Sequence, residues 1–219
     1  MVERFNESNY ENGIVELFVE ELGYTAAIGS ELQQEITNPF LEDEIENLYS
    51  INFALSKEAV YKAIQKIRFL EIGTLEQRNA LFTDYLQNGV PVSYRDQGNG
   101  YHEDRNVIVK LIDYDKVDAN SFYIVQQFNI KEYEAQGIKG HKRPDIVLFI
   151  NGLPLVVMEL KSPYRELQDE DDPYKQIRNA IKALPTFFSY NAICVISDQL
   201  TNRAGTITSS FDRFMEWKS

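Results

Sequence analysis

The sequence is poor in cysteine and histidine and lacks any long apolar run. A single cysteine, Cys194, excludes an internal disulfide framework and a zinc site built from cysteines. The two histidines, His102 and His141, have no metal-ligand spacing, so we expect both at the surface. No window approaches the roughly 18 consecutive apolar residues of a membrane span, and the first residues lack the pattern of a signal peptide. We therefore expect a cytoplasmic protein with no membrane partner.

Positive charge is also scarce. The 219 residues include 22 Lys and Arg against 34 Asp and Glu, a formal charge of −12, which argues against DNA binding by the whole surface because clustered cations bind the phosphate backbone. Any DNA contact must be local or be supplied by partners. One local candidate for a DNA contact lies immediately before Asp145 and consists of Lys139, His141, Lys142 and Arg143. The alternative is that these residues form a solvated basic turn between two strands.

The first third of the chain has the periodicity of helices. An apolar face at helical spacing is followed by Gly23 as a stop signal. Thr74 opens a capping-box sequence, and Asn88-Gly89 closes the helix that follows it. The predicted helices span residues 10–22, 41–51, 57–70 and 74–87.

The pattern then changes to strands rich in β-branched and aromatic residues. Asn151-Gly152 between two of them is a strong hairpin signal. A further helix over 173–184, capped by Asp172, precedes an apolar strand at 192–196. We predict an α/β fold in one domain over 1–219, with a helical segment at about 10–90 and a β-rich core at about 91–210. The other predicted strands are 107–112, 122–128, 146–150 and 155–160.

Two carboxylates and an ammonium group meet at the open end of the predicted hairpin. If 151–154 makes the turn, residues whose numbers sum to about 304–306 face each other, with Cβ atoms roughly 5 Å apart. Asp145 then lies across from Glu159 or Leu160, and Lys161 projects from the same face as Glu159. The alternative is a surface salt bridge between Lys161 and either carboxylate.

This grouping has the chemistry of a hydrolytic centre. Two close carboxylates repel unless a cation compensates, and Mg²⁺ binds one or two carboxylates together with several waters. Such an ion can polarise a phosphate and lower the pKa of a bound water. Lys161 can orient or deprotonate that water, or neutralise charge that develops on the phosphate.

Glu11 is a further candidate metal ligand. At about 100° per residue it falls near the middle of the apolar arc of the first helix, whereas Glu16 and Glu20 point away from that arc. A carboxylate on a buried face needs a partner, and a metal site would supply one. A frayed helix start would explain Glu11 equally well, and Glu21 at the edge of the arc is a weaker candidate.

The remaining features indicate structural roles. Cys194 lies within an apolar strand and is expected in the core. The acidic runs 42–44 and 169–172 are expected to be solvated faces or caps. The aromatic run 187–190 could stack on bases, but core packing is the favoured interpretation.

The hairpin run over 143–163 closely resembles the nuclease domain of the restriction subunit of type I restriction–modification enzymes, in the PD-(D/E)XK superfamily. The resemblance covers essentially the whole chain, with supporting stretches at 10–12, 21–24, 190–192 and 197–198. The closing segment 204–217 resembles the one that leads into the motor in that family. The family implies a restriction-endonuclease-like core, a mixed β-sheet flanked by helices, and a helical N-terminal extension.

The resemblance also implies the site. Asp145, Glu159 and Lys161 would be catalytic, and Mg²⁺, with Mn²⁺ as a substitute, would be held by both carboxylates. Glu11 and the backbone carbonyl of Leu160 would complete the ligands.

One motif departs from the family pattern. Family members usually have a Q-x-x-x-Y element on the helix after the hairpin, which assists DNA handling and cleavage. Gln176 is present here, but the fifth position is Ala180, which puts the contribution of the tyrosine in doubt. An amide on a solvated helix edge is the alternative role for Gln176.

By resemblance, the chain is expected to be a type I site-specific deoxyribonuclease that makes double-strand breaks in unmodified DNA. Its partners would be double-stranded DNA, the modification and specificity subunits, and its own downstream motor domains. Because the sequence has no G-x-x-x-x-G-K-[ST], ATP would act only through motor domains absent from this chain. Two alternatives are a free-standing repair or recombination nuclease and a non-catalytic docking module with a nuclease-like fold.

Overall fold

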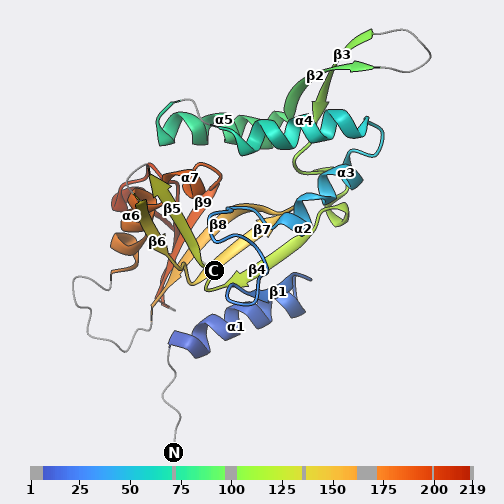
Figure 1. The fold of residues 1–219 in the computed structure, drawn as a ribbon. Coiled ribbons are helices and arrows are strands. Elements are labelled where there is room, and N and C mark those ends of the chain that lie inside the picture. The colour runs from blue at the N-terminus through green and yellow to red at the C-terminus, as the bar shows by residue number, and fades with distance from the viewer. Residues whose placement is uncertain are drawn as a thin grey trace, which may run out of the picture.

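A seven-stranded mixed sheet runs through the centre of the protein in the computed structural model (Figure 1), which describes residues 7–70, 73–96, 103–134, 137–161, 172–198 and 200–217. The strand order is β1-β4-β7-β8-β9-β10-β11. β1 pairs with β4 and β8 with β9 in parallel, and the other neighbours are antiparallel. The strands are Thr25–Ile28 (β1), Phe122–Gln126 (β4), Ile146–Ile150 (β7), Leu153–Leu160 (β8), Ile193–Ser197 (β9), Asn202–Gly205 (β10) and Met215–Glu216 (β11).

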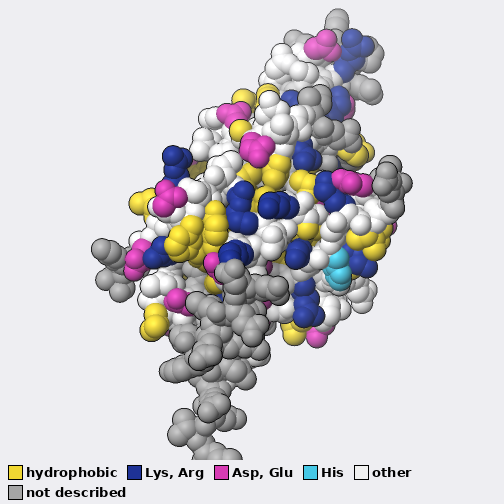
Figure 2. All heavy atoms as spheres, turned by 90° about the vertical axis from the view of Figure 1, so that its left-hand side faces the viewer, with side chains coloured by type: hydrophobic (Ala, Val, Ile, Leu, Met, Phe, Trp, Pro, Cys, Tyr) yellow, Lys and Arg dark blue, Asp and Glu magenta, His cyan; other side chains and the backbone are white. Residues whose placement is uncertain are grey.

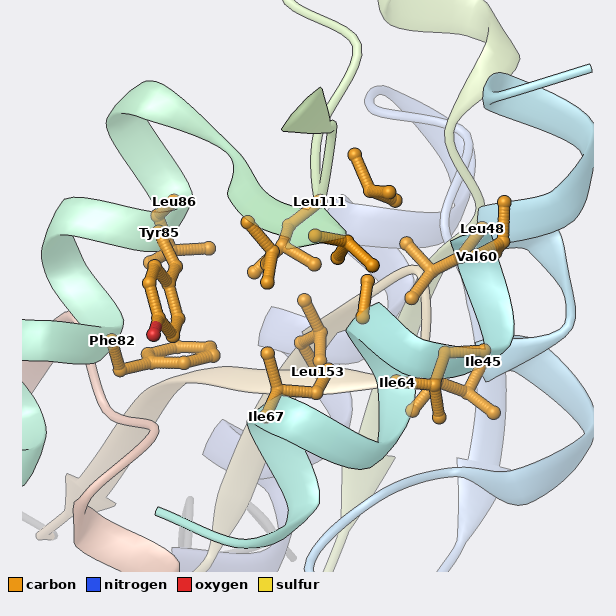
Figure 3. Close-up of a cluster of buried hydrophobic side chains, with 14 of the residues drawn as sticks. Ile45, Leu48, Val60, Ile64, Ile67, Phe82, Tyr85, Leu86, Leu111 and Leu153 are labelled. Atoms are coloured by element: carbon orange, nitrogen blue, oxygen red, sulfur yellow. The ribbon is translucent and has the colours of Figure 1, made fainter. Parts of the chain in front are cut away.

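Helices cover both faces of this sheet (Figure 1). The side chains of β7 and β8 alternate between two apolar clusters, one shared with α1 and the other with α6 and α7. A third cluster packs α2 to α5 around the turn end of the β7–β8 hairpin, where Leu153 lies among side chains of α4 and α5 (Figure 3). The helices are Glu7–Glu20 (α1), Glu42–Ile45 (α2), Asn47–Ile51 (α3), Lys57–Arg68 (α4), Leu75–Asn88 (α5), Pro173–Ala183 (α6) and Pro185–Phe188 (α7), with 3-10 turns at Val117–Ala119 (η2) and Phe211–Arg213 (η4).

Two hairpins stand outside the main sheet (Figure 1). β2 (Val90–Asp96) pairs with β3 (Glu103–Val109), and β5 (Ile130–Glu134) pairs with β6 (Gly137–Lys142). The strand predicted at 107–112 therefore ends at Val109 and pairs with β2 rather than with β4. None of the described helices is long and apolar enough to cross a membrane.

Local capping signals placed most helix ends correctly. The Thr74 hydroxyl and the Gln77 side chain form the predicted capping box of α5, and Asp172 accepts the N–H of Tyr174 at the start of α6. The helix predicted at 41–51 is instead two short helices, α2 and α3. The apolar face predicted for the helix over 10–22 includes Leu17 and Leu22, and it is partly wrong because these side chains are 54% and 58% exposed. Leu22 also lies beyond the end of α1.

The β7–β8 turn has only two residues, Asn151 and Gly152, with φ of 50° and 75°. The predicted turn over 151–154 is thus too long, and the pairing sum next to it is 303. A register shift between Leu148 and Phe149 then places Ile146 opposite Met158, a sum of 304 at the lower end of the predicted 304–306. A Cβ on Gly152 would lie 2.6 Å from both the Leu41 carbonyl oxygen and the Ile45 nitrogen. Glycine is therefore required by the backbone conformation and by the close approach of α2.

Asn151 is fully buried and links this turn to the loop before β4. Its amide donates to the Leu111 carbonyl and to Asn120 Oδ1, both at 2.8 Å. Its own Oδ1 accepts from Asn47 Nδ2 at 2.8 Å and from the Ser121 N–H at 2.9 Å. The hydrogen bonds of this one side chain therefore hold the hairpin in its place.

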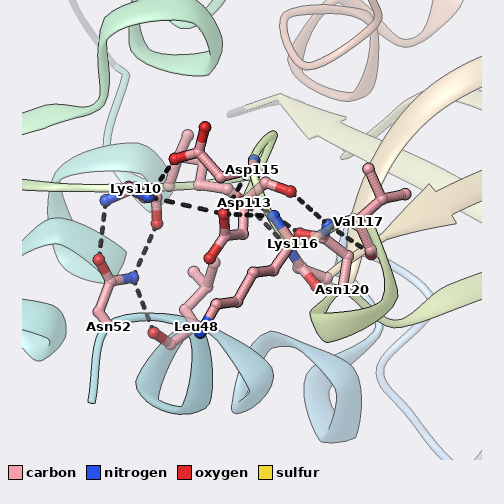
Figure 4. A network of polar contacts seen from close by, with 10 residues as sticks. Leu48, Asn52, Lys110, Asp113, Asp115, Lys116, Val117 and Asn120 are labelled. Carbon is pink, nitrogen blue, oxygen red and sulfur yellow. Dashed lines mark hydrogen bonds and ion pairs between the residues drawn. The ribbon is translucent and has the colours of Figure 1, made fainter.

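The loop that Asn151 contacts is itself ordered by side-chain hydrogen bonds (Figure 4). Asp113 Oδ1 accepts the N–H groups of Asp115 and Lys116, both at 3.1 Å. Asn120 donates to the main-chain oxygens of Asp113 and Val117, each at 2.9 Å. The β2–β3 hairpin is thereby joined to the main sheet through a fixed connection.

We expect Asn151→Ala to lower the free energy of unfolding by about 2–4 kcal/mol, because it leaves buried donors and acceptors unpaired and puts alanine at a positive φ. Urea denaturation monitored by circular dichroism measures this. Asn88→Ala, which removes an exposed amide that donates to Asp84, serves as the control and should cost under about 1 kcal/mol. Equal losses in the two variants would contradict the role assigned to Asn151.

Candidate active site

Asp145 and Glu159 lie together at the open end of the β7–β8 hairpin. Asp145 Oδ2 accepts the N–H of Leu160 at 2.8 Å, and the side chains of Asp145 and Glu159 are hydrogen-bonded to each other. Glu159 is only 8% exposed, while Asp145 is half-buried. The predicted placement of Asp145 across from Glu159 or Leu160 is thus the observed one.

Lys161 extends the same strand edge. Its N–H donates to the Ser197 carbonyl at 2.8 Å, so the pairing with β9 continues one residue past β8. Because side chains alternate along a strand, Glu159 and Lys161 project to the same face, which is the α6 face. Lys161 is 8% exposed, and its charge acts on the Glu159 carboxylate. The structure therefore brings together the three residues that the sequence grouped.

The pKa of Glu159 lies well above its usual range. Burial is the main cause, since it disfavours the charged form. The charge of Asp145 and the hydrogen bond to that side chain raise the pKa further, whereas the charges of Lys161 and Lys142 lower it. The arrangement thus favours a protonated Glu159 that donates to the Asp145 carboxylate.

Glu11 reaches this pair through another residue. It is half-buried on α1, which covers the face of the sheet opposite to α6. Gln127 Nε2 donates to Glu11 Oε2 at 3.0 Å and to Asp145 Oδ1 at 3.3 Å. Sequence analysis missed Gln127, although the polar pair Gln126-Gln127 inside an aromatic strand was a signal that could have found it.

The donor set fits a hard divalent cation. Among the described residues, no three His, Cys, Asp or Glu side chains gather into a metal-binding cluster. Mg²⁺ needs only one or two carboxylates, because it keeps several waters, and the Asp145–Glu159 pair offers two. One of these carboxylates is buried beside the other, and a cation would relieve their repulsion. The ligand roles of Glu11 and the Leu160 carbonyl stay predictions.

Gln176 lies in the first part of α6. Its N–H donates to the Asp172 carbonyl at 3.0 Å, and its side chain is half-buried. Ala180, one turn further, is 1% exposed and packs in the cluster between α6 and the sheet. A tyrosine at that position would therefore require repacking of this core. The assisting role of Gln176 stays a prediction.

The residues predicted to be structural are largely so. Cys194 is fully buried, and burial raises the pKa of its thiol to about 12; the aromatic run 187–190 is in the core as predicted. His141 is exposed and contacts Asn129. The 42–44 run lies in the first turn of α2, where Glu42 also forms an unpredicted bidentate ion pair with Arg68 at 2.7 and 2.5 Å. His102, the end of the hairpin run at 162–163, and 169–171 lie outside the described residues.

The raised pKa of Glu159 should make the folding stability of the protein depend on pH. Between the ordinary glutamate pKa and the raised one, the native state binds more protons than the unfolded chain, so the contribution of Glu159 to stability falls as the pH rises. Below the ordinary pKa that contribution is fully present. Glu159→Gln keeps a donor for Asp145 and does not titrate. We therefore expect this variant to gain in melting temperature over the wild type as the pH is raised from about 4 to 8 with a chelator present.

Thermal unfolding at each pH measures the difference between the two proteins. Glu16→Gln, on the exposed side of α1, is the control and should follow the wild type at every pH. Parallel pH profiles for the wild type and Glu159→Gln would show that no unfavourable charge is carried at this position.

Comparisons with known proteins identify the family of the chain. The family model described as type I restriction enzyme R protein N terminus matches residues 4–213. A putative type I restriction enzyme MjaIXP endonuclease subunit of Methanocaldococcus jannaschii is 31% identical over 91% of this chain and 19% of its own length. The type I restriction enzyme HindI endonuclease subunit of Haemophilus influenzae is 36% identical over 82% of this chain and 16% of its own length. The chain thus spans less than a fifth of the length of these relatives, and it belongs to the family of type I restriction enzyme R protein N-terminal domains.

Proposed function

We propose that the chain is a Mg²⁺-dependent endonuclease domain of a type I restriction subunit, with a PD-(D/E)XK-type centre that hydrolyses DNA phosphodiester bonds. The observation that carries this proposal is the contact of buried Glu159 with Asp145 beside Lys161. The printed names of its relatives as endonuclease subunits agree with it. Within the assembled enzyme the result would be double-strand breaks in unmodified DNA.

Each residue has a distinct role in this proposal. Asp145 and Glu159 would hold the cation, which would supply Lewis-acid activation of the phosphate and of a water. The hydrogen bond from the Leu160 N–H orients Asp145. Lys161 places an ammonium group on the same face as Glu159, where it would neutralise negative charge that builds on the phosphate or orient the attacking water.

The proposed DNA partner requires positive charge near this pair. β6 and α6 together contain five Lys and Arg and no Asp or Glu, in a chain of formal charge −12. Figure 2 shows Lys and Arg side chains gathered on the face that carries these elements. The charge of Lys142 on β6 acts on Glu159, and Lys175 and Lys182 on α6 are exposed. These cations would contact phosphates that flank the cut bond.

The remaining partners follow from the length of the relatives. The chain corresponds to less than a fifth of each relative, so motor activity driven by ATP would reside in the rest of such a subunit. Modification and specificity subunits would supply methylation and sequence recognition. The local basic face and the negative overall charge agree with a domain that cuts DNA held by these partners.

Calorimetric titration with Mn²⁺ tests the metal centre. We expect binding by the wild type and a loss of at least about tenfold in affinity in Asp145→Ala and in Glu159→Ala, because each removes a ligand. Glu16→Ala should bind as the wild type does. Lys161→Gln should keep the metal but lose cleavage when it is assembled into the full restriction complex.

Circular dichroism establishes that every variant is folded. Absence of Mn²⁺ binding by the folded wild type, or binding that survives both alanine substitutions, would reject the proposed centre. Either result would favour a docking module whose carboxylates serve only the fold.

DNA binding tests the basic face. We expect Lys175→Gln with Lys182→Gln to weaken binding of a short duplex and to reduce the slope of log affinity against log salt by about two. Fluorescence anisotropy with Ca²⁺ in place of Mg²⁺ measures both. The charge-matched control, Lys57→Gln with Lys62→Gln, changes exposed lysines of α4 and should leave the slope unchanged. Equal effects of the two pairs would indicate a response to net charge alone.

A further inference from the structure

We propose that Gln127 is a positioning residue of this centre and holds the carboxylates of Glu11 and Asp145 in place to bind one shared cation. This inference rests on the proposed function. Gln127 follows β4 directly and contacts Asp145 twice. Its main-chain N–H donates to the Asp145 carbonyl at 2.8 Å, and its side-chain Nε2 donates to Asp145 Oδ1 at 3.3 Å. The same Nε2 donates to Glu11 Oε2 at 3.0 Å.

The backbone of Gln127 is held in an unfavourable conformation. Its φ is 53°, in the left-handed region that non-glycine residues seldom adopt. The end of β1 fixes this turn, because the Gly29 N–H donates to the Gln126 carbonyl at 2.8 Å. A Cβ on Gly29 would lie 2.3 Å from the Gln127 carbonyl oxygen, so only glycine permits the approach. Such conformations persist where the surrounding structure over-determines them, and they cluster at functional sites.

The geometry explains why a bridge is needed. Asp145 and Glu159 meet through strand pairing, on the α6 face of the sheet. Glu11 comes from α1, which packs on the opposite face. Strand pairing cannot bring Glu11 to Asp145 and Glu159, because Glu11 is on a helix. The Gln127 amide, at the end of β4, instead connects Glu11 to Asp145.

The chemistry of an amide suits this task. Its NH₂ group has two N–H donors, one for each carboxylate. It carries no charge, so it orients the acids without neutralising them. Their combined negative charge is then available to a divalent cation. An ammonium group at this position would itself act as the compensating cation.

The neighbouring Gln126 offers a matched control. Its Nε2 donates to Asn12 Oδ1 at 3.0 Å, so it also ties the end of β4 to α1. That bond involves no carboxylate. If Gln127 only fastened α1 to the sheet, loss of either glutamine side chain would have a similar effect on the centre.

Gln127→Gly tests the proposal, because glycine accepts the positive φ and removes only the amide bridge. We expect the wild-type melting temperature to be kept or raised, while the affinity for Mn²⁺ falls about tenfold, as for other residues that orient metal ligands. In the assembled restriction complex, the Mg²⁺ concentration for half-maximal cleavage should rise while cleavage at saturating Mg²⁺ is largely retained. Gln126→Ala should change neither quantity.

A double-mutant cycle separates positioning from an independent effect. Because Gln127 positions both Glu11 and Asp145, Gln127→Gly combined with Glu11→Ala should weaken Mn²⁺ binding by less than the sum of the two single losses. Additive losses, or wild-type affinity in Gln127→Gly, would overturn the inference.

Failure of this inference is distinguishable from failure of the proposed function. Wild-type Mn²⁺ binding that disappears in Asp145→Ala but is unaffected by Gln127→Gly would reject the positioning role alone. No Mn²⁺ binding by the folded wild type would reject both.

Discussion

The register of the β7–β8 hairpin is the constraint on which the rest of the site depends. A shift by one residue would turn Glu159 and Lys161 to the α1 face, since side chains alternate along a strand. Asn151 and Gly152 fix this register from the far end, by buried hydrogen bonds and by a close approach to α2. The helical cluster of α2 to α5 therefore contributes to the chemistry at a distance, because it packs around the turn that aligns the two carboxylates.

Sequence reasoning was most successful where the information is local. The capping box at Thr74, the cap at Asp172 and the Asn-Gly turn each depend on a few adjacent residues, and all three are observed. The grouping of Asp145, Glu159 and Lys161 follows from one hairpin and could be worked out from spacing alone. Short-range rules are sufficient for such features because the interacting groups are close in the chain.

Features that depend on distant partners were missed. β1 was not predicted, because four residues within a helical segment give little pattern and its strand character comes from pairing with β4, almost one hundred residues later. Gln127 was missed for the same reason: its significance lies in Glu11 and Asp145, which approach it only in the fold. The ion pair of Glu42 was missed because Arg68, its partner, is on another helix. In each case tertiary contacts overrode what local composition suggested.

The assembly of the site from distant segments has a consequence for biosynthesis. Glu11 leaves the ribosome well before its bridge at Gln127 and the pair at Asp145 and Glu159, which follow more than one hundred residues later. Contacts between such separated segments form slowly, because the entropy cost of closing a long loop comes before the stabilisation that the contacts provide. A nascent chain consequently has no assembled centre until β8 has been synthesised and paired. Under the proposed function, order of synthesis would thus withhold DNA cleavage from an unfinished chain.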